Sequence, residues 1–181
     1  MPQSALIVPV PEAEPTVARW RARFDPSARL GVPAHVTLLF PFVAPQRLSS
    51  AILQAIGDLC ASADVFDFAL RAVGQFPGVL YLAPEPTAPF IALTERLVGR
   101  FPQCPPYGGR HRDIRPHLTV AQAGDAELLQ VRTALMAALD GRPIAATCTR
   151  ISLIENASGP WRPVRDFALR GSAAFRPPAA S

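Results

Sequence analysis

The stretch AHVTLLFPF, Ala34 to Phe42, has a counterpart later in the chain in PHLTVAQ, Pro116 to Gln122. Each stretch holds a histidine, one apolar residue and a threonine, followed by further apolar residues. Both are short apolar runs next to proline, and such runs predict β-strands. The chain has three histidines, and two of them, His35 and His117, occupy this repeated H-x-T motif, 117 − 35 = 82 residues apart.

Strand geometry places the polar side chains of each motif together. Residues i and i+2 of a strand point to the same side, so His35 and Thr37 share one face, as do His117 and Thr119. The apolar residues between them anchor the opposite face. Two such strands facing each other across a cleft would offer two imidazoles and two hydroxyls to one ligand.

That set of groups suits in-line displacement at a phosphodiester, which needs a base on the attacking side and an acid on the leaving side. Histidine, with an ordinary pKa of about 6.5, can serve as either near neutral pH. Threonine hydroxyls can donate hydrogen bonds to the non-bridging oxygens, where negative charge develops. No carboxylate or cysteine lies at a spacing from either motif that suits a metal ion, so no metal or other cofactor is expected. The alternative for each histidine is a hydrogen-bonded residue of the core.

The remaining periodicity predicts that one order of elements occurs twice: strand, helix, motif strand, helix and strand, followed by one closing strand. The spacing from His35 to Val65 equals that from His117 to Thr147, since 65 − 35 = 30 and 147 − 117 = 30. Expected helices cover 12–24, 45–63, 87–101 and 125–139, and expected strands cover 5–10, 34–42, 65–76, 79–83, 117–122, 147–155 and 161–169.

This repeat predicts an α+β fold with two pseudo-symmetric lobes of mainly antiparallel sheet, outer helices and a central cleft that carries both motifs. We expect each motif strand near the middle of its sheet. The expected domain is one bilobal unit over residues 1–175, with an internal repeat at about 5–76 and 79–155 and a closing strand at 161–170. Residues 176–181 are expected to form a mobile tail.

The paired H-x-T motifs resemble those of the two-histidine (2H) phosphoesterase superfamily. Within it, the chain resembles the bacterial 2'-5' RNA ligase and RNA 2',3'-cyclic phosphodiesterase family, including the approach to the second motif, PPYGGRHRDIRPHLTVA. The likeness extends from about residue 5 to about residue 170. It implies a 2H phosphoesterase fold and catalysis by His35 and His117 with Thr37 and Thr119. It also implies that His117 acts as the base and His35 as the acid in hydrolysis.

The same resemblance implies the substrate: RNA with a 2',3'-cyclic phosphate end or a small cyclic nucleotide, hydrolysed without metal, with reversible 2'-5' ligation as a further activity. The irregular stretch 102–115 leads into the second motif, and long loops in compact domains are often functional. Candidate substrate-binding residues are therefore Tyr107, Arg110 and Arg115, together with the aromatic rings of Phe42 and Trp161, which could stack on a base or pack in the core.

Composition limits the other function classes. The formal net charge is +4, which permits an anionic ligand without requiring a nucleic-acid groove. Three widely spaced cysteines suggest neither a zinc site nor a disulfide framework. The N-terminus does not resemble a signal peptide, and no apolar run is long enough for a membrane helix, so a cytoplasmic protein is expected. We also expect a monomer. The alternative to an enzyme is a module that binds nucleotides or RNA ends with little chemistry.

Overall fold

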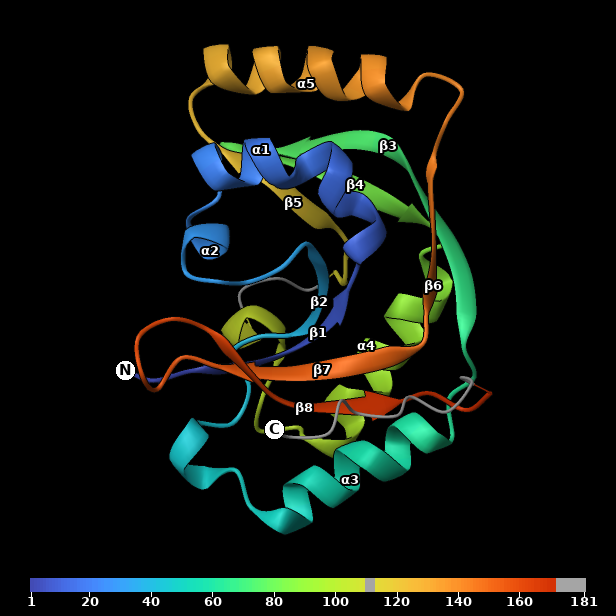
Figure 1. The fold of residues 1–181 in the computed structure, drawn as a ribbon. Coiled ribbons are helices and arrows are strands. Elements are labelled where there is room, and N and C mark those ends of the chain that lie inside the picture. Colours follow the sequence, from blue (N-terminus) through green and yellow to red (C-terminus); the bar gives the residue numbers. More distant parts are fainter. Residues whose placement is uncertain (110–112, 172–181) are drawn as a thin grey trace, which may run out of the picture.

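Two four-stranded antiparallel sheets account for the named strands in residues 1–109 and 113–171, the residues that this computed structural model describes (Figure 1). The first sheet has the order β2-β1-β7-β8, and the second has the order β5-β4-β3-β6. The strands of the first sheet are β1 Ser4–Pro9, β2 His35–Leu39, β7 Arg150–Glu155 and β8 Arg162–Ala168. Those of the second are β3 Phe66–Phe76, β4 Val79–Glu85, β5 Leu118–Gln122 and β6 Ile144–Cys148. The predicted α+β class with antiparallel sheets is confirmed.

The helices that precede the two motif strands each pack on the other motif's sheet. The α-helices are α1 Glu14–Phe24, α2 Pro26–Arg29, α3 Ser50–Ala61, α4 Ala88–Arg100 and α5 Asp125–Leu139, and short 3-10 turns lie at Pro11–Ala13, Pro45–Arg47 and Pro106–Gly109. Helix α1 packs against β5 of the second sheet, whereas α4 packs against β2 of the first. Helix α3 lies along β8, and α5 lies on the second sheet (Figure 1). Each motif strand is therefore covered by the helix that precedes the other motif.

The two sheets do not follow the two halves of the chain. Strand β3 comes from the first half but pairs with β4 through a hairpin at Pro77 and Gly78, where Gly78 has φ +73°. Neighbouring strands joined by a short turn pair with each other, so β3 joins the second sheet.

The strand expected at 147–155 is also divided. Residues Ile144–Cys148 pair with β3, and residues Arg150–Glu155 pair with β1, so the chain passes from one sheet to the other at Thr149. β6 exposes alternate residues, whereas β7 is buried along most of its length. The single apolar run therefore contains two strands that belong to different sheets. Hydrophobicity along the sequence does not show where one strand ends and the other begins.

The motif strands lie at the edges of their sheets, and the expectation that they lie near the middle is wrong. β2 pairs with β1 alone and β5 with β4 alone in the described sheets. The two edges contact each other, so the motifs meet at the junction of the lobes. One contiguous apolar core, which includes Val36, Leu82, Phe90 and Leu118, runs beneath both sheets. No helix in residues 1–109 and 113–171 combines the length and apolar character needed to cross a membrane.

Candidate active site

The two H-x-T motifs line one cleft of about 790 Å³ at the junction of the two sheets. Its walls include His35, Thr37, His117 and Thr119, the four residues predicted to carry the chemistry. His35 begins β2, and His117 directly precedes β5. The structure therefore brings together, on one cavity, motifs that lie 117 − 35 = 82 residues apart in the sequence.

Burial alternates along each motif as strand geometry requires. The histidines and threonines are half-buried, whereas Val36, Leu38, Leu118 and Val120 are almost completely buried. Adjacent residues of a strand face opposite sides, so the apolar members anchor each strand in the core while the polar members face the cleft.

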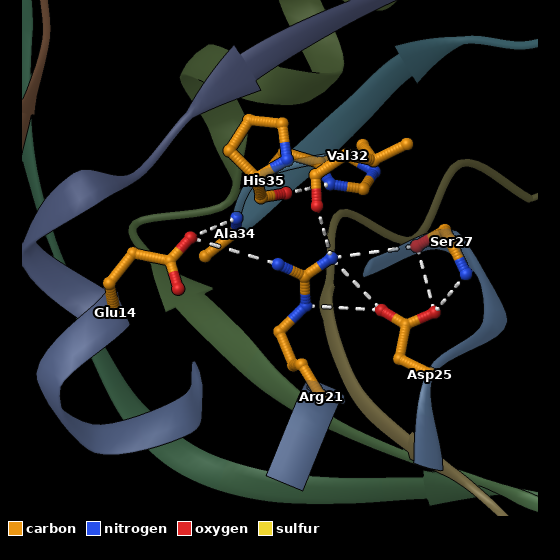
Figure 2. Close-up of polar contacts among 8 residues, drawn as sticks. Glu14, Arg21, Asp25, Ser27, Val32, Ala34 and His35 are labelled. Atoms are coloured by element: carbon orange, nitrogen blue, oxygen red, sulfur yellow. Dashed lines mark hydrogen bonds and ion pairs between the residues drawn. The ribbon is translucent and has the colours of Figure 1, made fainter. Parts of the chain in front are cut away.

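Each imidazole is held by the carbonyl group two residues before it. The Nδ1 of His35 lies 2.8 Å from the Pro33 carbonyl oxygen, and the Nδ1 of His117 lies 2.7 Å from that of Arg115 (Figure 2 for His35). A carbonyl oxygen only accepts hydrogen bonds, so Nδ1 carries the proton and donates in both rings. In the neutral form, Nε2 is then the basic atom of each ring.

Burial lowers the pKa of both histidines. For His35, desolvation is the main cause and brings the pKa to about 4, with the charges of Arg21 and His117 acting in the same direction. The bond to Pro33 and the charge of Asp25 oppose this shift. Desolvation also lowers the pKa of His117, against the bond to Arg115. Both rings are therefore neutral in the ligand-free cleft at pH 7, and an anion bound between them would raise both pKa values.

The surroundings of the two histidines differ although their motifs match. The His117 ring lies edge-on to Phe76, with centroids 5.3 Å apart, and next to Tyr81, with centroids 5.4 Å apart. Phe76 and Tyr81 stack on each other at 4.4 Å. On the His35 side, the cleft is lined by Asp25 and Ser27 instead. One imidazole therefore has aromatic neighbours and the other has a charged network.

That network centres on Arg21, whose side chain is 3% exposed (Figure 2). Its guanidinium donates to Asp25 Oδ2 at 3.0 Å from Nε and to the Val32 carbonyl at 3.1 Å from Nη2. Asp25 in turn accepts from the backbone N–H and hydroxyl of Ser27 at 2.9 and 2.8 Å. The network thereby ties helix α1 to the segment that leads into His35.

Glu14 completes this network at its other end. One carboxylate oxygen, Oε1, accepts from the Ala34 N–H at 2.6 Å and lies 3.8 Å from Arg21 Nη1. Ala34 is fully buried next to the motif histidine. The backbone on both sides of Pro33, whose carbonyl anchors His35, is therefore held by side chains of α1.

The loop before the second motif contributes two of the predicted substrate-binding residues. Tyr107 and Arg115 both line the cleft. The Tyr107 N–H donates to the Phe40 carbonyl at 2.6 Å, which ties the loop to the end of the first motif strand, and burial raises the pKa of the Tyr107 phenol. Arg115 lies 3.9 Å from Asp113. Arg110 lies outside the described residues, as do residues 176–181, the expected tail.

The two predicted stacking aromatics do not line this cleft. Phe42 is 7% exposed and packs edge-on against Phe101 in the core, with centroids 5.1 Å apart. Trp161 lines a separate cavity of about 280 Å³, and the centroid of its ring lies 6.1 Å from that of Phe40. Neither ring is among the residues that line the histidine cleft: Phe42 lies in the core, and Trp161 is partly buried against Phe40.

Other residues that line the cleft were not predicted from the sequence as site residues: Asp25, Ser27, Phe40, Phe76, Pro77, Val79, Asp113 and Gln122. The Asp-Pro-Ser sequence at 25–27 is a typical helix start, and Asp25 is the N-cap of α2; such a signal marks an element, not a site. Among the residues that the structure describes, no group of three or more His, Cys, Asp or Glu side chains is arranged to hold a metal ion.

Comparison with known proteins identifies related sequences. The family model described as the 2'-5' RNA ligase superfamily matches residues 9–160. A Bacillus cytotoxicus protein with a provisional phosphoesterase name is 33% identical over 111 residues, covering 59% of this chain and 62% of that protein. A Bacillus cereus protein with a similar name is 33% identical over 112 residues, with the same coverage. The chain thus matches about three fifths of the length of these curated relatives.

Solved structures share the fold. The TT0787 protein of Thermus thermophilus has a TM-score of 0.64 at 19% identity, covering 94% of this chain and 99% of that one. LigT of Escherichia coli in complex with 3'-AMP has a TM-score of 0.57 at 21% identity, covering 93% and 98%. LigT has also been crystallised with ATP and with NADP+. At these identities, the likeness establishes a common architecture.

Proposed function

This chain belongs to the 2'-5' RNA ligase superfamily, and on that premise we propose that its cleft hydrolyses 2',3'-cyclic phosphate ends of RNA or nucleotides without a metal ion. Membership confirms the 2H phosphoesterase resemblance inferred from the paired motifs. One observation carries the proposal: two imidazoles with the same Nδ1 anchor and two threonine hydroxyls line a single cleft. The nucleotide complexes of LigT support the ligand class.

The proposed reaction uses Nε2 of both rings. One neutral imidazole takes a proton from water as the water oxygen bonds to phosphorus. The other, as imidazolium, gives its proton to the 2' or 3' oxygen as that P–O bond breaks, which yields a phosphate monoester and a free hydroxyl. We assign His117 as base and His35 as acid by family likeness. A 2'-5' linkage would form in the same direction, with a 5' hydroxyl in place of water: its oxygen bonds to phosphorus as the bond to the 3' oxygen breaks. The roles of the two histidines would exchange when that linkage is cleaved back to the cyclic phosphate.

Bound substrate supplies the charge that this mechanism needs. Burial leaves both histidines neutral in the empty cleft at pH 7 because it lowers the pKa of each, whereas a phosphodiester anion beside them favours the imidazolium form. The threonine hydroxyls would donate to the non-bridging oxygens, and Arg115 adds a positive charge to the same wall. We include a cytoplasmic, monomeric state in the proposal, and the three buried free cysteines suit a reducing compartment.

The direct test is to incubate the protein with adenosine 2',3'-cyclic phosphate in EDTA and to identify the product. We expect turnover to a single monoester. Binding without turnover would favour the alternative, a nucleotide-binding module, and a strict requirement for a divalent ion would exclude the proposed mechanism.

The threonine hydroxyls can be tested separately. Thr37→Ala and Thr119→Ala should each lower kcat/KM about tenfold to a hundredfold, because a hydrogen bond to a charged group contributes about 1.5–3 kcal/mol. The melting temperature should stay close to that of the parent. Thr133→Ala is a matched control, since that hydroxyl is exposed and donates to the Leu129 carbonyl of its own helix, at 3.0 Å, away from the cleft. Parental activity in both motif variants would remove these hydroxyls from the site.

The pH dependence of the reaction follows from the lowered pKa values. Activity requires one neutral and one protonated imidazole, so kcat/KM plotted against pH should be bell-shaped. This parameter reports the free enzyme, in which the pKa of His35 is about 4 and that of His117 is also lowered. The optimum of kcat/KM should therefore lie below about pH 6.5, the ordinary histidine value.

The optimum of kcat should lie at higher pH than that of kcat/KM, because the bound anion raises both pKa values. Initial rates in EDTA between about pH 4 and 9 would measure the two optima, since this range brackets the ordinary histidine pKa. A flat profile with chemistry rate-limiting, or a kcat/KM optimum above about pH 7, would contradict the assignment.

A further inference from the structure

A second cavity of about 400 Å³ opens beside the histidine cleft; we call it the side cavity. It lies between helix α4, strand β2 and the described residues that precede the second motif. Thr37, Tyr107, Asp113 and Arg115 line both cavities. A ligand with its phosphate at Thr37 can therefore extend into the side cavity without leaving the site.

The walls of the side cavity suit a flat, uncharged ring. Leu38, Val98 and Ile114 are among the apolar residues that line it. Apolar walls with a few polar groups are typical of small-molecule sites. The volume exceeds that of a single nucleobase, so a base and part of its ribose can enter.

The charges on these walls select the kind of ring. Glu95 and Asp113 contribute two carboxylates, and Arg115, 3.9 Å from Asp113, contributes a guanidinium. No ion pair of the described residues involves Glu95. A carboxylate accepts hydrogen bonds but cannot donate them, and it repels a further phosphate. Glu95 therefore favours a donor-bearing group over a continuing phosphate chain.

We propose that the side cavity binds a nucleobase that carries an exocyclic amino group, an inference that rests on the proposed phosphodiesterase function and deepens it. Adenine, cytosine and guanine each carry such an amino group, whereas uracil carries a carbonyl oxygen instead. With the phosphate between the two histidines and the base beside Glu95, the substrate would span both cavities through Thr37. The enzyme would then prefer amino-bearing nucleotides over uridine nucleotides.

Gly99 offers a test that spares the catalytic groups. It lies on α4 and lines the side cavity, and a Cβ built on it would have no atom within 4 Å. Gly99→Leu should place a side chain in this space, and leucine is also the better helix former. Ala92→Leu is the matched control, because Ala92 is exposed on the same helix and does not line the cavity.

Calorimetry with 3'-AMP, 3'-UMP and inorganic phosphate gives the readout. Gly99→Leu should raise the Kd of 3'-AMP at least about tenfold and leave that of phosphate within about twofold, and Ala92→Leu should change neither. The parent should bind 3'-AMP about tenfold more tightly than 3'-UMP, because a hydrogen bond to a charged group lowers the Kd by about that factor. Glu95→Gln removes the charge and should reduce the ratio of the two Kd values to about one.

Several results would overturn the inference: 3'-AMP binding no tighter than phosphate, equal affinity for 3'-UMP, or unchanged 3'-AMP affinity in Gly99→Leu. These measurements do not depend on turnover. Lack of hydrolysis of cyclic phosphates, with the expected binding pattern, would reject the proposed function alone. Hydrolysis of adenosine and uridine 2',3'-cyclic phosphates at equal kcat/KM would reject the base site alone.

Discussion

His35→Ala and His117→Ala should each lower kcat for a 2',3'-cyclic phosphate by about 10²–10⁴-fold, the usual contribution of a positioned general acid or base. Each substitution removes one Nε2, and the remaining imidazole cannot both accept and donate a proton in the same step. Binding of 3'-AMP should change much less, because the threonine hydroxyls and Arg115 stay in the cleft. Single-turnover rates and calorimetry on the same preparations would separate the two effects.

The third histidine of the chain provides the control for this pair. His111 lies outside both H-x-T motifs in the sequence, and His111→Ala should keep the parental rate. A motif variant that retains a tenth or more of the parental kcat would contradict a role in proton transfer. Equal loss in all three variants would indicate that the rate depends on something other than the paired motifs.

Arg21→Met should destabilise the protein by about 3–5 kcal/mol, the cost of leaving one charge of a buried pair without its partner. Asp25 is completely buried, and with Arg21 removed its carboxylate would keep only the two hydrogen bonds from Ser27 among the described residues. The Val32 carbonyl would lose its donor as well. Equilibrium unfolding in urea would measure this loss, which is a large fraction of the roughly 5–15 kcal/mol typical of folded proteins.

An exposed ion pair gives the contrast. Arg170 forms two hydrogen bonds with Asp64, at 2.6 and 2.8 Å, but both side chains are more than half exposed. Solvent screens such pairs, so Arg170→Met should cost much less stability than Arg21→Met. The double variant Arg21→Met with Asp25→Asn should be more stable than Arg21→Met alone, since it removes the unpaired, completely buried charge of Asp25. Equal stability of the Arg21→Met and Arg170→Met variants would contradict the claim that burial makes the Arg21–Asp25 pair more costly to break than the exposed pair.

The local features of the site were predictable from the sequence because they depend on short-range geometry. Strand alternation places His35 beside Thr37 and puts Val36 on the opposite face in any sheet, and in the structure that opposite face is buried. The helical spacing of apolar residues likewise predicted the four long helices; the largest difference is at the start of the helix expected over 45–63, where a 3-10 turn occupies Pro45–Arg47 and α3 begins at Ser50. The repeated motif indicated the family because each copy is one continuous segment, so it can be recognised without knowing the fold.

Which elements meet was decided only by the tertiary structure. Strands pair with partners that are distant in the sequence, and the hydrophobicity of a segment does not indicate its partner. The tertiary structure assigned β3 to the second sheet, divided 147–155 at Thr149, and placed both motif strands at sheet edges. It also distinguished Phe42 in the core from Phe76 beside His117, two phenylalanines with the same intrinsic hydrophobicity. Arg21 and Asp25 are ordinary helix and turn residues in the sequence. Only packing buries their charges next to the segment that leads into His35, where low exposure makes the pair costly to break.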